Sequence, residues 1–156
     1  MTSCSVFEPE FITKLALIFE ERISFNRLLG LRLDTIEADA VTAHIGMRPE
    51  LIGHYTHQRL HGGVISAALD AMGGLAVMAA IGARHMGEAV DARLARFSKL
   101  GTIDLRIDYL RPATGERFDL AACVLRLGSR VANTRMECFD ARGTLCATGA
   151  AAYIVS

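Results

Sequence analysis

The sequence lacks an excess of charge of either sign. Its 156 residues include 17 Lys and Arg and 17 Asp and Glu, so the formal net charge is zero. A protein that binds nucleic acid usually carries an excess of basic residues, and we therefore expect no nucleic-acid partner. A near-neutral surface also favours self-association.

Metal-ligand spacing and a leader segment are also lacking. The four cysteines (Cys4, Cys123, Cys138 and Cys146) form no CxxC pair. We predict no metal site and interpret them as small, reduced, buried or half-buried side chains. The first nine residues contain no basic region and no apolar stretch, which predicts a cytoplasmic protein without a secretory signal. At about 150 residues per domain, residues 1–156 are predicted to form a single domain.

One apolar run, residues 64–83, is long enough to cross a bilayer. Its only polar residues are Ser66 and Asp70. An aspartate at mid-membrane would cost about 2.5–3.5 kcal/mol, and the Gly73-Gly74 pair weakens a helix further. We therefore predict no membrane span here, but a helix over 61–82 that is buried on nearly all sides of a soluble protein.

Hydrophobic periodicity predicts the order helix, two strands, long helix, four strands. The expected ranges are an amphipathic helix over 9–25, strands over 31–37 and 40–48, a loop over 49–60, and the long helix over 61–82. Residues 83–100 show no clear period, and a helix over 89–100 is left open. Strands are then expected from Thr102 to Arg111-Pro112 and over 118–127, 131–139 and 145–155, joined by short connections into an antiparallel meander.

Six antiparallel strands need a cover for their apolar face, and the long helix is the element that can supply it. The sequence therefore predicts an α+β fold, in which an antiparallel sheet wraps around one long central helix, with an extra N-terminal helix.

The start of the long helix is a candidate functional site, because His61 is followed there by Gly62 and Gly63. The first N–H groups of a helix have no internal partner and carry the positive end of the helix dipole, so they can polarise a carbonyl oxygen. Asp70 follows Gly63 by two helical turns, or about 10 Å at 1.5 Å per residue. Buried carboxylates are rare unless paired, so Asp70 is either functional or bonded to backbone or an arginine. His61 has a structural alternative too, that of fixing the loop.

His61-Gly62-Gly63, followed after six residues by Asp70 in a long apolar helix, resembles the hotdog-fold thioesterases of the PaaI-type group. Residues 101–113 and 128–131 are similar to that group's strand after the helix and its next hairpin. The resemblance covers about residues 31–156 and extends to the YigI-like subgroup of medium- and long-chain acyl-CoA thioesterases. It implies a hotdog core over 31–156 and hydrolysis of an acyl-CoA to a free acid and CoA, with no cofactor besides the CoA of the substrate.

The resemblance also implies catalytic roles. Asp70 is expected to act as general base or nucleophile, the Gly63 N–H to bind the thioester carbonyl, and Thr102 to place the water. The family often has an asparagine a few residues before the histidine, where this sequence has none. We expect His54 or Tyr55 in its place, with His54 as the catalytic candidate.

The expected substrate-binding residues are His61, Gly62, Tyr55, Arg111 and Arg130, the two arginines as candidates for the phosphates of CoA. Arg117 and Arg126 also lie near predicted turns, although a solvated charge at a strand end is the better explanation for any single one of these arginines. Residues 83–100 are expected to shape the acyl pocket.

Family sites form between two subunits, with the aspartate of one facing the helix start of the other. The resemblance therefore implies a homodimer or a dimer of dimers. Two alternatives remain open. One is a hotdog hydratase or dehydratase that pairs His54 or His57 with Asp70. The other is a non-catalytic acyl-CoA sensor, for which the N-terminal helix is too small to bind DNA by itself.

Overall fold

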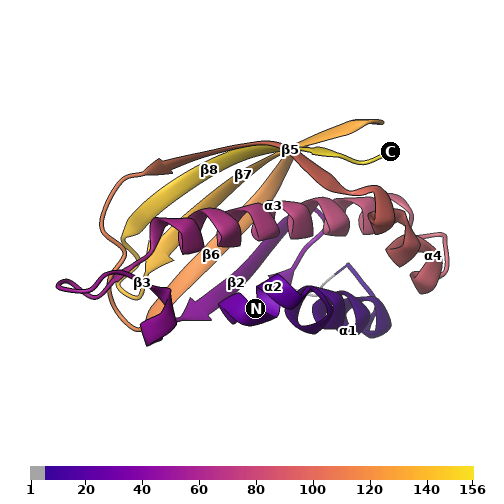
Figure 1. Cartoon of the computed structure of the whole chain (residues 1–156). Helices are drawn as coiled ribbons and strands as arrows, with labels where there is room; N and C mark the ends of the chain where they lie inside the picture. The colour runs from indigo at the N-terminus through magenta and orange to yellow at the C-terminus, as the bar shows by residue number, and fades with distance from the viewer. Residues whose placement is uncertain (1–5) are drawn as a thin grey trace.

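The computed structural model describes residues 6–156. A six-stranded antiparallel sheet lies over one long helix, α3 (Gly62–Arg84), as Figure 1 shows. The strand order is β1-β2-β6-β7-β8-β5. The strands are β1 (Arg32–Ile36), β2 (Ala40–Gly46), β5 (Gly101–Tyr109), β6 (Arg117–Leu127), β7 (Val131–Asp140) and β8 (Leu145–Ile154). The predicted α+β architecture is confirmed.

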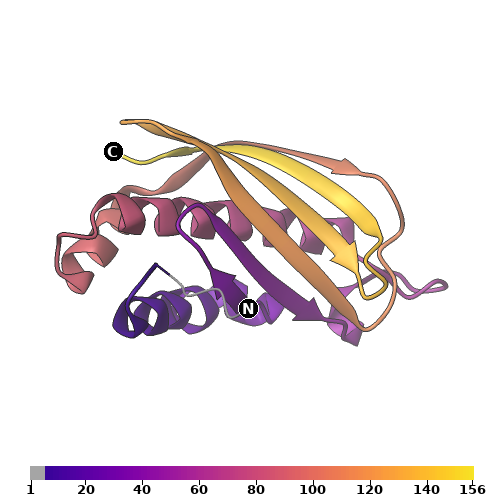
Figure 2. The ribbon, with the colours of Figure 1, turned by 180° about the vertical axis from the view of Figure 1, so that it is seen from behind.

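The four C-terminal strands do not form one meander, and this part of the prediction is wrong. β6, β7 and β8 are consecutive neighbours, but β5 pairs with β8 at the far edge of the sheet, and β6 pairs with β2. Residues 110–116 carry the chain across the end of the sheet (Figure 2). Alternation along a strand fixes which face each residue takes but not which strand lies beside it, so periodicity could not predict this neighbour.

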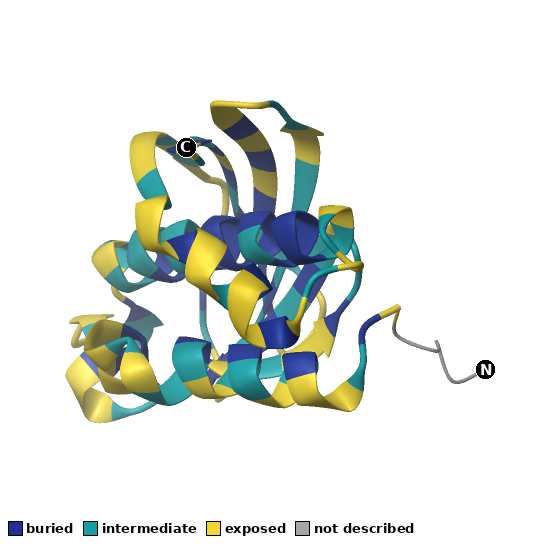
Figure 3. Cartoon of the chain, turned by 90° about the vertical axis from the view of Figure 1, so that its right-hand side faces the viewer, coloured by how far each residue is buried: buried dark blue, intermediate teal, exposed yellow. Residues whose placement is uncertain are grey.

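The core lies between α3 and the sheet. In β2 the side chains of Val41, Ala43 and Ile45 are buried and alternate with exposed or half-buried ones, and Figure 3 shows such alternation as bands along the strands. Helix α3 is long and apolar enough to cross a membrane, but most of its apolar part is buried inside the protein. It is the core helix that the sequence predicts.

The N-terminal helix is not continuous as predicted. α1 (Pro9–Leu17) widens into one π-helical turn, η1 (Ile18–Arg22), and the chain becomes extended at Ile23. It then restarts as α2 (Ser24–Leu29), which ends at Gly30 in the left-handed conformation (φ 75°) that favours glycine. The break changes the direction of the chain, so that α2 packs against α3.

Secondary structure is present in residues 49–60, which were predicted to be a loop, and in residues 83–100, for which a helix was left open. Residues 49–60 contain a 3-10 turn, η2 (Pro49–Leu51), and a small hairpin of β3 (Ile52–His54) and β4 (Arg59–Leu60). After α3, the helix left open is present as α4 (Val90–Ala95) with a 3-10 turn, η3 (Arg96–Lys99). The fully buried Arg93 of α4 contacts α1, with its guanidinium 4.5 Å from the centre of the Phe11 ring.

The cysteines within the described residues are free thiols. Cys138 and Cys146 are buried and Cys123 is half-buried, which confirms the prediction for these three, while Cys4 lies outside the described residues. Burial raises the pKa of Cys138 to about 12, so its thiol stays protonated and unreactive near neutral pH.

Candidate active site

Asp70 lies on the side of α3 that faces β5 and β8. The Thr102 hydroxyl donates a hydrogen bond to Asp70 Oδ1 at 2.8 Å. The Tyr153 hydroxyl donates to the main-chain oxygen of Asp70 at 2.8 Å and lies 3.2 Å from Oδ1. Both contacts to the carboxylate therefore use Oδ1, and no described residue bonds Oδ2. Thr102 and Tyr153 come together because they are opposite each other in the β5–β8 register.

Tyr153 is a site residue that the sequence reasoning missed. Burial, and then the negative charge of Asp70, raise the pKa of Tyr153 far above its usual value, so the phenol remains a donor. Gly73 makes room for it, because a side chain at that position would collide with the Tyr153 hydroxyl. One signal was available: Tyr153 is a tyrosine at a core-facing position of an alanine-rich strand, and a buried phenol needs a partner.

A cavity of about 330 Å³ opens beside Asp70. It is lined by Phe19, Ile23, Phe25, Asn26, Ala67, Asp70, Ala71, Gly74, Met78, Leu100, Gly101, Thr102 and Tyr153. The amide of Asn26 is occupied, since it donates to the carbonyl of Phe19 at 3.0 Å. None of the lining residues is Lys or Arg. The carboxylate of Asp70 thus borders a mainly apolar space.

The start of α3 has a different arrangement from the predicted one. The Gly63 N–H donates to Nδ1 of His61 at 2.8 Å, so His61 caps the helix and has the structural role left open above. The Gly63 N–H can reach a substrate only if this imidazole turns away. The carbonyl of Gly62 accepts a hydrogen bond from the Tyr109 hydroxyl at 2.7 Å. A side chain at Gly62 would lie 3.3 Å from the Tyr109 ring.

The structure separates His54 and Tyr55 from Asp70 within one chain. Both belong to the hairpin that contains β3 and β4, which projects from the end of the molecule where α3 begins (Figure 1). The Tyr55 side chain is 87% exposed. The His54 ring lies 6.1 Å from that of Tyr55 and 4.7 Å from that of His57.

The two predicted phosphate ligands lie at opposite ends of the sheet. Arg111 follows β5, donates to the carbonyl of Leu145 at 3.1 Å and borders a hollow that also includes Gly62 and Tyr109. Arg130 lies in the turn between β6 and β7, where its carbonyl accepts the N–H of Val155. Of these two arginines, only Arg111 is near the helix start of the same chain.

Residues 83–100 contribute little to the cavity beside Asp70, to which they supply only Leu100. They mainly border a separate hollow of about 360 Å³ at the C-terminal end of α3. Its basic residues are already engaged in part, because Arg84 donates to the carbonyl of Leu127 at 2.6 Å and Arg96 pairs with Glu88. Within residues 6–156, no three His, Cys, Asp or Glu side chains are grouped to hold a metal ion.

A family model of the thioesterase superfamily matches residues 57–147, which include His61, both glycines, Asp70 and β5. The chain belongs to the thioesterase superfamily. It is 38% identical over 138 residues to the medium/long-chain acyl-CoA thioesterase YigI of Escherichia coli (strain K12), a match that covers 88% of this chain and 89% of the relative.

Solved structures agree with this assignment. A crystal structure of a Shewanella oneidensis protein related to the thioesterase superfamily superposes with a TM-score of 0.88 at 38% identity, covering 96% of this chain and 100% of that one. Mouse thioesterase superfamily member 2 gives a TM-score of 0.74 at 18% identity over 96% and 100% of the two chains, a likeness of fold alone. The predicted family, the hotdog fold and the prediction of a thioesterase are confirmed.

Proposed function

We propose that this protein is an acyl-CoA thioesterase that hydrolyses the thioester to a carboxylic acid and CoA. The observation that carries the proposal is the position of Asp70, a carboxylate held by two hydroxyl groups at the border of an apolar cavity. The 38% identity to an acyl-CoA thioesterase over most of the chain supports the same substrate class. No further cofactor is required by this chemistry, and we expect the enzyme to act in the cytoplasm.

The contacts of Asp70 suggest which oxygen reacts. Thr102 and Tyr153 hold Oδ1, and Oδ2 remains to meet a water or the thioester carbon. As general base, Oδ2 takes a proton from water while the water oxygen attacks the thioester carbon. The C–S bond then breaks, and the proton goes to the departing thiolate of CoA. As nucleophile, Oδ2 attacks the carbon and expels the thiolate, and water then hydrolyses the resulting anhydride. In both routes we assign Thr102 to orienting the carboxylate as well as to placing the water.

A second copy of the chain is needed to complete this site. The N–H groups at the start of α3 lie about 10 Å along the helix from Asp70, at 1.5 Å per residue. A thioester whose carbon is in attacking distance, about 3–3.5 Å from Oδ2, cannot also place its carbonyl oxygen on those N–H groups. We therefore propose a homodimer in which the helix start of one copy, at Gly62 and Gly63, faces Asp70 of the other.

The open edge of β5 is the surface we assign to this contact. β5 is an edge strand with an unpaired side along nine residues. Such an edge pairs readily with another strand. Antiparallel pairing of two β5 strands would bring the Tyr109 end of one copy beside the Gly101 end of the other. Arg111 of one copy and Arg130 of the other would then approach the same site, where both remain candidates for the phosphates of CoA. A dimer of dimers remains the alternative assembly.

Thiol release from acetyl-, phenylacetyl-, octanoyl- and palmitoyl-CoA tests the activity, and light scattering after gel filtration tests the assembly. We expect turnover of at least one acyl class by a dimer or a larger even assembly. Tight binding without turnover would instead support an acyl-CoA sensor, and hydration of an enoyl-CoA without thiol release would support a hydratase. A fully active monomer would contradict the shared site.

A further inference from the structure

We propose that the cavity beside Asp70 holds the acyl chain of the substrate, and that Gly74 and Met78 limit the length of chain that it accepts. This inference rests on the proposed thioesterase activity and adds to it the subsite that selects among aliphatic acids. In this proposal the N-terminal segment forms the wall of the cavity that faces α3, with the side chains of Phe19, Ile23 and Phe25.

The lining of the cavity suits a hydrocarbon. One wall is a stripe on α3 formed by Ala67, Ala71, Gly74 and Met78, which recur at the spacing of one helical face. The opposite wall consists of Phe19, Ile23 and Phe25. Because no Lys or Arg lines this space, the phosphates of CoA would find no counter-charge in it, whereas an alkyl chain would bury apolar surface.

The geometry gives the cavity a reactive end and a far end. Asp70 and Met78 are separated by eight residues of helix, or about 12 Å at 1.5 Å per residue. Ala71 and Gly74 lie between them and have almost no side chain to occupy the space. Met78 is the first large side chain of the stripe beyond Asp70. A straight chain that enters with its carbonyl at Asp70 would therefore run over Gly74 and end against Met78.

Close packing does not explain the glycine at position 74. A Cβ added to Gly74 would make only ordinary contacts, 3.8 Å to the Tyr153 ring and 3.9 Å to Leu100. The neighbouring Gly73 differs, because a side chain there would collide with the Tyr153 hydroxyl. Glycine inside a helix is less favourable than alanine. No contact within the chain therefore explains why glycine rather than alanine stands at position 74. The open space that it leaves for a ligand gives an explanation.

The break in the N-terminal helix is what forms the second wall. The π-helical turn ends at Arg22, and the extended backbone of Ile23 changes the direction of the chain. Phe19, Ile23 and Phe25 thereby all reach the same cavity, although the first lies before the break and the last after it. π-helical turns are frequent at functional sites.

The test is the dependence of kcat/KM on acyl-chain length, measured with butyryl-, octanoyl- and palmitoyl-CoA. For Gly74→Val we expect the ratio of octanoyl-CoA to butyryl-CoA kcat/KM to fall at least tenfold, because the valine shortens the usable space. For Met78→Ala we expect the ratio of palmitoyl-CoA to octanoyl-CoA kcat/KM to rise. The control is Gly87→Val, since Gly87 is exposed and has no atom within 4 Å of an added Cβ. We expect it to leave both ratios unchanged.

The outcomes separate this inference from the proposed function. If the wild type releases no thiol from any acyl-CoA, the proposed function fails, and calorimetric binding of butyryl-, octanoyl- and palmitoyl-CoA to the same variants replaces kcat/KM as the readout. Equal losses for short and long chains in a folded Gly74→Val variant, or no change in any variant, would overturn the inference. If Gly74→Val does not fold, Gly74→Ala adds only the Cβ for which the structure has room, and we then expect a smaller shift in the same direction.

Discussion

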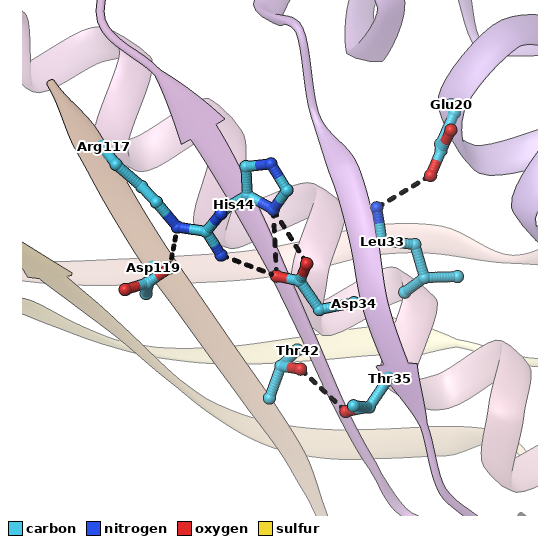
Figure 4. A network of polar contacts seen from close by, with 8 residues as sticks. All are labelled: Glu20, Leu33, Asp34, Thr35, Thr42, His44, Arg117 and Asp119. Carbon is cyan, nitrogen blue, oxygen red and sulfur yellow. Dashed lines mark hydrogen bonds and ion pairs between the residues drawn. The ribbon is translucent and has the colours of Figure 1, made fainter. Parts of the chain in front are cut away.

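Two aspartates of this protein, Asp70 and Asp34, show how surroundings decide what a carboxylate can do. Asp34, on β1, lies in a network on the outer face of the sheet, where His44 Nδ1 is 2.9 Å from Oδ1 and Arg117 Nη2 is 3.4 Å from Oδ2 (Figure 4). Arg117 also donates to Asp119 at 2.7 Å. Among residues 6–156, the carboxylate of Asp70 is bonded only by the neutral hydroxyls of Thr102 and Tyr153.

The difference lies in charge and in shape. In isolation, an aspartate beside a histidine suggests a catalytic pair, but Asp34 is already bonded by a cation and the side chains of its network are 26–48% exposed. Asp70 is oriented without being paired to a cation, and it borders an apolar cavity. A carboxylate that is held but not neutralised retains its capacity to act on a substrate.

The largest effect is expected for Asp70→Asn. It removes the proposed base or nucleophile while keeping the shape of the side chain, so kcat for thiol release should fall by about 10²–10⁴-fold. Asp34→Asn is the matched control and should change kcat less than twofold. Comparable losses in the two variants would contradict the contrast between the two aspartates.

A buried charged pair elsewhere in the chain extends the comparison between buried and exposed charges to the free energy of unfolding. Arg93 is fully buried and pairs with Glu8, whereas Arg117 of the outer network is about half exposed. Glu8→Ala would leave the Arg93 charge buried without its carboxylate, and we expect a loss of about 3 kcal/mol in the free energy of unfolding, the lower end for a broken buried pair. Urea denaturation measures it. A loss below about 1 kcal/mol would mean that the buried Arg93–Glu8 pair stabilises the fold no more than the exposed ion pairs of Arg117 do.

The third prediction concerns how Asp70 is held. Tyr153→Phe removes one hydroxyl donor from Asp70 but keeps the ring in the core, so we expect kcat to fall about tenfold with little change in KM. The loss should be smaller than that of Asp70→Asn, because Thr102 still bonds Oδ1. Steady-state kinetics with a thermal melt of both proteins checks this. A normal kcat in the variant would mean that Thr102 alone positions the carboxylate.

These residues also show what the sequence could and could not predict. Asp70 was identifiable as a lone carboxylate in an apolar helix. The helix predicted over 61–82 is observed as Gly62–Arg84, so both predicted ends lie within two residues of the observed ones. The core-facing tyrosine at position 153 was a signal that a partner exists, but not which one, because periodicity does not say which residue of α3 a residue of β8 meets. That Thr102 joins Tyr153 at Asp70 depends on β5 lying beside β8, a pairing that periodicity does not give either. The occupied N–H of Gly63 depends on the orientation of the His61 side chain, and the break at Ile23 occurs within a run whose apolar spacing remains helical.

A smaller, pH-dependent effect is expected at Asp140, an aspartate that is bonded by backbone N–H groups and by the side chain of Arg142. The N–H of Thr144 and the side chain of Arg142 lower the pKa of Asp140 from 3.8 to about 2. The stabilisation is therefore complete above the unfolded value and is lost as the pH falls from about 4 towards 2. Asp140→Asn should remove this part of the pH dependence. An unchanged slope of unfolding free energy against pH in that window would contradict the assignment.

The smallest effect is expected within the outer network itself. Arg117→Ala removes the contacts to Asp34 and Asp119, but exposed ion pairs contribute about 0–1 kcal/mol, so the free energy of unfolding should fall by less than about 1 kcal/mol. Arg126→Ala, on the same strand and without an ion-pair partner among the described residues, gives the baseline. Salt at about 1 M shortens the Debye length to about 3 Å and should remove most of the difference between these two variants. A loss of unfolding free energy above about 2 kcal/mol that does not change with salt would mean that the network stabilises the fold substantially. Exposure would then not explain why Asp34 and Asp70 differ.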